Sequence, residues 1–255
     1  MDRLTGKTIL VTGASKGIGA AIAMRLAAEG AHVIAQYGRD RAGAEAALAD
    51  CPPERKHLLA ADFGDPANAD TLWQQATAWR GHVDVLVANA AIMHNAGGID
   101  APDEEWDAVW EETMRVNVLS PARLMRNAVR HFRGRGGGSL IALTSWVVHR
   151  GTGVPEALAY AASKSAVAAT AKTIARAYAK EGVLAYCVAP GVVRTQMSVD
   201  AAASQGGEAA VSAGLAMGEW IPPEDIADVV AYLAEGRARH LTGATIDVNG
   251  ASYVR

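Results

Sequence analysis

The sequence predicts an α/β protein whose single domain, residues 1–255, is built on a doubly wound sheet of about seven parallel strands flanked by helices. Short apolar runs alternate with stretches of helical period along the whole chain, which is typical of parallel strands buried on both faces. Half of the residues are hydrophobic and 26 are glycine, which suits one large core. No repeat of fixed period and no Pro- or Ser-rich linker divides the chain.

The strands are expected at seven runs separated by helical stretches. In chain order they are TILV (8–11), HVIAQ (32–36), HLLAA (57–61), VDVLVA (83–88), SLIAL (139–143), VLAYCVA (183–189) and ATIDV (244–248). The glycine-rich residues 134–138 precede a strand and no helix, so we interpret them as a turn. Residues 196–220, rich in Ala, Gly and Ser, interrupt the alternation before a helix that begins at Pro222-Pro223.

Composition argues against several classes of function. The formal charge is −3, from 24 basic and 27 acidic residues without a basic stripe, so neither nucleic acid nor an anionic membrane is expected as a partner. No signal peptide and no apolar run of membrane-spanning length is found. Cys51 and Cys187 have no ligand spacing, which predicts a reducing, cytoplasmic setting and no metal site.

The first strand is followed at once by a glycine turn and a helix. The turn reads TGASKGIG, in which Gly13 permits a tight bend, Gly17 lets a backbone approach a pyrophosphate and Gly19 allows close packing of helix on sheet. A helix N-terminus offers free N–H groups and a positive dipole to phosphates. The G-x-x-x-G-x-G spacing differs from the G-x-G-x-x-G fingerprint and from a Walker loop.

Tyr160 and Lys164 form the second signal, in the sequence Tyr-Ala-Ala-Ser-Lys. Residues i and i+4 are neighbours on one face of a helix. A cation beside a phenol favours phenolate, so Lys164 is expected to lower the pKa of Tyr160. The pair is therefore a candidate for acid–base chemistry, although such a spacing also arises by chance in helices.

Together these segments, over almost the whole chain, resemble the short-chain dehydrogenase/reductase family, whose fold is of the Rossmann type. Further motifs match in order: Asn117 in RVNVLSP, Ser145 at the end of SLIALTS, the Pro190–Thr195 loop PGVVRT, and the last strand LTGATIDVNG. The family's Asn-Asn-Ala-Gly segment is Ala88-Asn89-Ala90-Ala91 here, so two of its four residues differ. Ser145 lies fifteen positions before Tyr160, two more than in many relatives, which leaves Thr144 as an alternative to Ser145.

The resemblance implies hydride transfer between a nicotinamide coenzyme and a carbonyl or secondary alcohol. It assigns Tyr160 as general acid or base, Lys164 as its partner and ribose ligand, Ser145 as donor to the substrate oxygen and Asn117 as holder of a proton relay. The implied coenzyme residues are Gly13, Ser15, Lys16, Gly17, Ile18, Gly19, Arg39, Asp62, Phe63, Asn89, Ala90, Tyr160, Lys164, Pro190, Gly191, Val193 and Thr195. A rival interpretation is a coenzyme-binding sensor or scaffold that has lost the reaction.

In NAD-preferring relatives an acidic residue ends the second strand, whereas here no carboxylate precedes Asp40. Lys16 and Arg39 suit a 2′-phosphate, so NADP(H) is the expected coenzyme, and NAD(H) is the alternative if Asp40 binds the ribose.

The resemblance also implies that residues 196–220 cover the substrate. It implies a homotetramer or homodimer paired through the helix of Tyr160. Arg150 with His149 would suit an acidic substrate.

Overall fold

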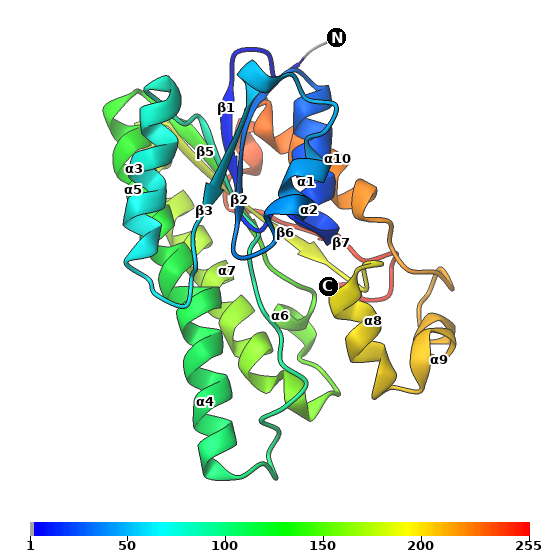
Figure 1. Cartoon of the computed structure of the whole chain (residues 1–255). Coiled ribbons are helices and arrows are strands. Elements are labelled where there is room, and N and C mark those ends of the chain that lie inside the picture. The colour runs from blue at the N-terminus through cyan, green and yellow to red at the C-terminus, as the bar shows by residue number, and fades with distance from the viewer. Residues whose placement is uncertain (1–2) are drawn as a thin grey trace.

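Seven parallel strands form one sheet in the order β3-β2-β1-β4-β5-β6-β7, in a computed structural model that describes residues 3–255 (Figure 1). The strands are β1 (Thr8–Val11), β2 (His32–Tyr37), β3 (Lys56–Ala60), β4 (Val85–Ala88), β5 (Gly138–Leu143), β6 (Val183–Pro190) and β7 (Thr245–Val248). The order reverses between β1 and β4, which are neighbours in the sheet although β2 and β3 separate them in sequence. The predicted doubly wound sheet is therefore confirmed.

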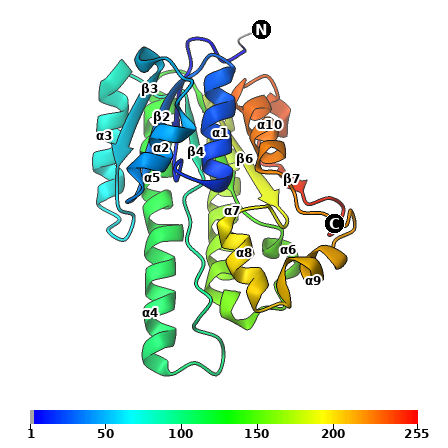
Figure 2. The same cartoon turned by 45° about the vertical axis from the view of Figure 1, so that its right-hand side comes forward.

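Helices cover both faces of this sheet (Figures 1 and 2). One face carries α1 (Gly17–Ala28), α2 (Arg41–Ala47) and α10 (Pro223–Ala234). The other carries α3 (Asn68–Arg80), α5 (Ser120–Gly134) and α7 (Leu158–Tyr178), while α4 (Asp103–Met114) extends beyond the sheet. Short helices α6 (Val147–Arg150), α8 (Gln196–Ala203) and α9 (Gly207–Ala213) lie past the carboxyl ends of β5 and β6.

Two apolar clusters hold these layers together, one on each face of the sheet. Alternate residues of a strand point to opposite faces, so Ile9 and Val11 of β1 join one cluster and Leu10 joins the other. Both cysteines are buried and free. Within residues 3–255, no helix combines the length and the apolar character needed to cross a membrane.

The strand register brings the carboxyl ends of β1, β4 and β5 level with one another. Val11 lies beside Val87, and Val87 lies beside Ile141. The loops after these strands therefore meet at one edge, next to the point where the strand order reverses, which is where doubly wound sheets place their ligands. The residues that follow β1, β4 and β5 include Gly13, Asn89 and Ser145.

Candidate active site

The turn between β1 and α1 leaves little room for a side chain at its three glycine positions. Gly13 has φ +66° and Gly17 has φ +54°, both in the left-handed region that favours glycine. A Cβ on Gly19 would overlap the carbonyl oxygen of Gly13, and one on Gly13 would lie 3.0 Å from the Cα of Ala90. The three glycines of the motif are therefore required by close backbone contacts.

Thr12 connects this turn to the loop after β4. Its hydroxyl accepts hydrogen bonds from the backbone N–H of Asn89 (2.9 Å) and of Ala90 (3.0 Å), and it donates to the carbonyl of Val87 (3.3 Å). The Asn89 side chain donates to the carbonyl of Thr12 at 2.8 Å. Asn89 and Ala90 therefore lie beside Gly13 as the sequence predicted, despite the two residues that depart from the family's motif.

This turn fits the diphosphate of a dinucleotide. The residue before α1, Lys16, makes no side-chain cap, so no side chain among the described residues occupies the N–H groups of the first turn of this 12-residue helix. The helix dipole adds positive potential there. Ser15 and the exposed Lys16 lie within the turn, while Ile18 is half-buried and packs against the core cluster of β1.

The residues expected around the adenosine lie at the ends of β2 and β3. Asp62 is exposed, and one of its carboxylate oxygens accepts from the N–H of Gly64 at 2.9 Å. Phe63 is buried in the core, and its carbonyl accepts the Ser120 hydroxyl at 2.8 Å, so only its backbone faces this loop. Arg39 is exposed just past β2. Asp40 caps α2, because its carboxylate accepts from the N–H of Gly43 at 2.8 Å.

The loop after β6 approaches the glycine turn from the other side. Pro190 ends β6, and a Cβ on Gly191 would come within 2.9 Å of the Asn249 side chain. Val193 is 3% exposed and pairs with Ile221. Thr195 caps α8 and lies against the turn, since a Cβ on Gly17 would meet its methyl group at 3.1 Å. The predicted coenzyme residues of this loop therefore line the same edge.

Tyr160 and Lys164 lie one turn apart on α7 and face the end of β5. The Lys164 ammonium lies 5.7 Å from the centre of the Tyr160 ring and donates to the carbonyl of Leu143 at 2.9 Å. The Ser145 hydroxyl lies close enough to the Tyr160 hydroxyl to lower the pKa of that phenol. The Thr144 hydroxyl instead donates to the carbonyl of Val188 at 3.0 Å, so of the two alternatives Ser145 faces the tyrosine.

Burial controls the protonation of this pair. It raises the pKa of Tyr160 to about 12, against a lowering by the hydrogen bond from Ser145. It lowers the pKa of Lys164 to about 8. The expectation that Lys164 brings the tyrosine pKa down is therefore wrong for the net shift, because desolvation of the phenolate is the largest effect and Ser145 is the group that opposes it. At neutral pH the tyrosine is a phenol and the lysine is mostly charged.

Asn117 occupies a π-helical turn, Arg115–Leu119, between α4 and α5. Its side-chain oxygen accepts from the N–H of Ile92 at 2.8 Å, and its nitrogen donates to the carbonyl of Ile92 at 2.8 Å and to Ser163 Oγ at 3.1 Å. The Ser163 hydroxyl donates in turn to the carbonyl of Tyr160 at 2.7 Å. The π-helical turn distorts the helix at Asn117, and these hydrogen bonds connect the loop after β4 to the helix of the tyrosine.

Tyr160 lies fifteen positions after Ser145, and the stretch between them folds into α6 and a 3-10 turn, Pro155–Ala157. The extra length is accommodated there, and it does not separate the two hydroxyls.

The Arg150 guanidinium lies 4.6 Å from the centre of the Trp146 ring. His149 has Asp247, Arg255 and Lys172 as charged neighbours, and burial lowers its pKa. Arg150 and His149 thus have different surroundings.

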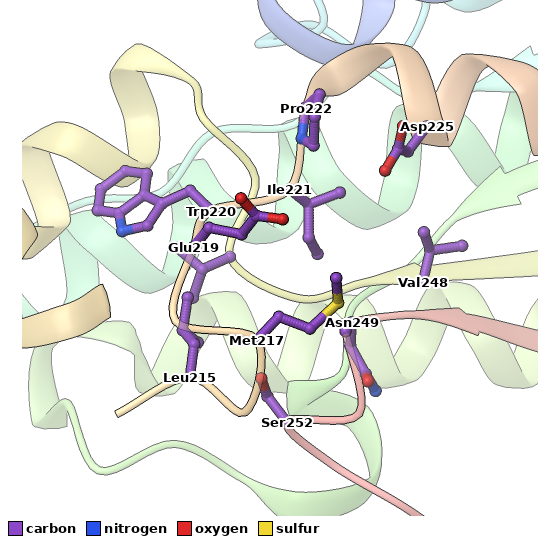
Figure 3. A pocket seen from close by; sticks show the side chains of 12 residues that line it. Leu215, Met217, Glu219, Trp220, Ile221, Pro222, Asp225, Val248, Asn249 and Ser252 are labelled. Carbon is purple, nitrogen blue, oxygen red and sulfur yellow. The ribbon is translucent and has the colours of Figure 1, made fainter. Parts of the chain in front are cut away.

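The 196–220 segment, which contains α8 and α9, is held at its base. The N–H of Arg194 donates to the carbonyl of Ile221 at 2.9 Å, and the N–H of Ile221 donates to that of Val192 at 2.9 Å. A cavity of about 70 Å³ lies behind this base, between the return from α9 to α10 and the loop after β7 (Figure 3). It is lined partly by Trp220, which is only 3% exposed, so this tryptophan packs at the base of the segment.

Sequence reasoning missed three residues that hold the site: Thr12, Gln36 and Ser163. Gln36 is 2% exposed and bonds through its side chain to Gly13 and Ala61. The signal for it was present, because a glutamine interrupts the apolar run HVIAQ of a strand buried on both faces. Thr12 and Ser163 stood within the quoted motifs, but their partners are distant in sequence.

Comparison with known proteins agrees with this geometry. A family model described as enoyl-(acyl carrier protein) reductase matches residues 13–251. The chain is 36% identical over 252 residues to 3β-hydroxysteroid dehydrogenase 1 of Eggerthella lenta, covering 98% of this chain and 94% of that protein. It is 35% identical over 249 residues to the 3-oxoacyl-(acyl-carrier-protein) reductase FabG of Escherichia coli K12, covering 98% of each.

Solved structures extend the agreement to three dimensions. A short-chain dehydrogenase from Burkholderia cenocepacia in complex with NADP superposes with a TM-score of 0.85 at 30% identity, covering 98% of this chain and 99% of that one. A Serratia marcescens short-chain dehydrogenase/reductase gives a TM-score of 0.86 at 34% identity, covering 98% and 100%. Because sequence and structure match over nearly the whole chain, the protein belongs to the short-chain dehydrogenase/reductase family and is an NAD(P)-dependent oxidoreductase acting on CH–OH and C=O groups.

Proposed function

We propose that the protein interconverts a carbonyl compound and a secondary alcohol with NADP(H), using Tyr160, Ser145, Lys164 and Asn117. The observation that carries this proposal is the placement of the Lys164 ammonium 5.7 Å from the centre of the Tyr160 ring and 2.9 Å from the carbonyl of Leu143, with the Ser145 hydroxyl near that of Tyr160. Two hydroxyls at the carboxyl end of β5 converge on the place where a substrate oxygen must gain or lose a proton.

Tyr160 donates the proton in the reductive direction. A phenol whose pKa is raised to about 12 by burial stays protonated at neutral pH, as a general acid must. Ser145 orients the substrate oxygen and stabilises the negative charge that develops there. The bound nicotinamide coenzyme supplies or accepts the hydride.

Lys164 and Asn117 support the proton transfer. As phenol becomes phenolate in a buried site, the nearby ammonium of Lys164 stabilises the new charge. Asn117 fixes the loop after β4 against α7 through Ile92 and Ser163, which holds Tyr160 at a constant position relative to that loop.

The test of this assignment is Tyr160→Phe, which removes the hydroxyl and keeps the ring. We expect kcat to fall at least about a hundredfold, the scale of general acid–base catalysis, while coenzyme binding is retained. Tyr178→Phe on the same helix is the matched control and should leave kcat unchanged. Near-normal turnover by folded, coenzyme-binding Tyr160→Phe protein would contradict the mechanism.

The preference for NADP(H) rests on charges at the end of β2. Gln36 is an uncharged amide that bonds within the protein, and one oxygen of the Asp40 carboxylate caps α2. No carboxylate therefore lies on β2 itself. Lys16 and Arg39 are exposed, and within residues 3–255 neither has a carboxylate within 4.0 Å. The structural relative bound to NADP supports the same preference.

The Arg39 side chain is therefore expected to distinguish the coenzymes. Arg39→Ala should lower kcat/KM for NADPH about tenfold or more and leave NADH within twofold, because only NADPH carries the 2′-phosphate. Lower kcat/KM for NADPH than for NADH in the wild-type protein would contradict the preference, and the catalytic assignment would stand.

The substrate class is a carbonyl or hydroxyl compound. The relatives are named for substrates as different as a hydroxysteroid, a 3-oxoacyl carrier protein and L-rhamnose, and each of those names implies an oxo or hydroxyl group.

We also propose that the protein is a homodimer or homotetramer paired through α7. Ala161, Ala162 and Ala166 are only half-buried there and Ala169 is exposed, which leaves room for a second helix.

A further inference from the structure

The Gln36 side chain links the glycine turn to the loop after β3. It lies at the carboxyl end of β2, is 2% exposed, and is paired in the sheet with Leu59. Its oxygen accepts from the N–H of Gly13 at 2.8 Å, and its nitrogen donates to the carbonyl of Ala61 at 2.8 Å. The backbone carbonyl of Gln36 also accepts from the N–H of Ala14 at 2.9 Å.

The chemistry of these partners requires an amide at position 36. One partner is an N–H, which can only donate, and the other is a carbonyl, which can only accept. A side chain that both accepts and donates, with the length of glutamine, satisfies both at once. A carboxylate can serve Gly13 but faces the Ala61 carbonyl with a lone pair, and an apolar side chain leaves two buried backbone groups without partners.

The position of the two partners gives this link a function. Gly13 begins the turn that is expected to hold the diphosphate, and Ala61 directly precedes Asp62 and Phe63, where the adenine is expected. The link therefore spans the two loops between which the adenosine half of a dinucleotide would lie. No contact between the Gln36 side chain and the coenzyme is needed for this role.

We propose that Gln36 is a positioning residue of the coenzyme site, which sets affinity for both NADPH and NADH by holding the glycine turn at a fixed distance from the loop after β3. This inference rests on the coenzyme site proposed above. It is separate from the proposed role of Arg39, because the turn and the adenine loop serve the parts that the two coenzymes share.

The experiment compares wild-type protein with Gln36→Met, Gln36→Glu and the control Gln75→Glu, which changes an exposed glutamine on α3. Dissociation constants for NADPH and NADH are measured by fluorescence titration, with kcat at saturating coenzyme. Gln36→Met should weaken both coenzymes about tenfold, equivalent to about 1.4 kcal/mol, and leave kcat within about twofold. Unchanged affinity for both would overturn the proposal.

Gln36→Glu gives a second, independent readout. A protonated glutamic acid donates to Ala61 and accepts from Gly13, so it restores the link, whereas the ionised form cannot donate. Affinity for both coenzymes should therefore equal that of wild type at acidic pH and fall as pH rises through the raised pKa of this buried acid. The control should follow the wild-type pH profile.

Two outcomes separate this inference from its rivals. Weakening of NADPH alone by Gln36→Glu would show repulsion of the 2′-phosphate and would overturn the positioning role. Wild-type protein that binds neither coenzyme would overturn the proposed site itself. If Gln36→Met does not fold, the pH profile of Gln36→Glu decides the question, because a profile identical to that of the control would also overturn the proposal.

Discussion

The glycine turn and the 196–220 segment border the same edge of the sheet but are held in different ways. Around the turn, Thr12, Gln36 and Asn89 bond to backbone groups across three strands, and Thr12 and Gln36 are at most 2% exposed. In the 196–220 segment only Ala202 and Trp220 are buried among the hydrophobic residues, and the charged side chains are exposed. The turn therefore has little freedom to vary, while the segment can change its surface without disturbing the sheet.

The contacts that hold the 196–220 segment are mostly between exposed side chains. The Arg194 guanidinium lies 5.4 Å from the centre of the Trp220 ring and forms an ion pair of 3.1 Å with Glu208 of α9. Surface ion pairs contribute little, typically below about 1 kcal/mol. We therefore expect coenzyme recognition to depend on the backbone geometry of the turn, whereas the placement of α8 and α9 depends on a few exposed side chains and on the bridge at their base.

The sharpest test of this difference exchanges glycine for alanine in each region. Gly19→Ala should abolish coenzyme binding and lower the free energy of unfolding by several kcal/mol, because its Cβ would overlap the Gly13 carbonyl. Gly214→Ala is the control, since its Cβ would meet the Val211 carbonyl at an ordinary 3.5 Å and its φ is −87°. Chemical unfolding and fluorescence titration check both. Wild-type stability and coenzyme binding by Gly19→Ala protein would contradict the proposed difference between the two regions.

A second prediction concerns Lys164, which lies between the two regions. Burial lowers its pKa from 10.5 to about 8, so the folded state disfavours the charged form by roughly 3 kcal/mol below that pH. Lys164→Met should abolish turnover yet raise the free energy of unfolding at pH 7 by about 1 kcal/mol, because part of the gain is offset by the lost hydrogen bond to Leu143.

The pH dependence gives the sign of this effect. The unfolded chain holds the lysine proton up to about pH 10 and the folded chain loses it near pH 8, so wild-type stability rises with pH between these values. The advantage of Lys164→Met should therefore shrink from pH 8 to pH 10 in urea unfolding. Lys180→Met, at an exposed lysine, is the control and should show no such trend. A constant advantage at all pH values would contradict the prediction.

The smallest expected effect is in the 196–220 segment. Arg194→Met removes the contacts with Trp220 and Glu208, so we expect KM for the carbonyl substrate to rise about two- to fivefold. Coenzyme dissociation constants and Tm should not change measurably. Arg237→Met, which removes an exposed arginine paired with Glu235, is the control and should leave KM unchanged. Weaker coenzyme binding by Arg194→Met would show that the two regions are coupled.

The sheet, the glycine turn and the Tyr160–Lys164 pair could all be predicted from the sequence. These features depend on spacings of a few residues, such as alternating apolar runs, glycines four and two residues apart, and a tyrosine one helical turn before a lysine. Short spacings are set by the geometry of the strand, turn and helix themselves, so they can be recognised before the fold is known.

Which polar groups meet, and how they are charged, follows from the packing of the helices and strands. Gln36 of β2 bonds to Ala61, which follows the neighbouring strand β3, and Asn117 bonds to Ser163, which lies 46 residues further along the chain. The choice of Ser145 over Thr144 follows from which hydroxyl faces Tyr160. The pKa of that tyrosine rises to about 12 because the fold buries it, and burial is a property of packed elements that no local spacing of residues specifies.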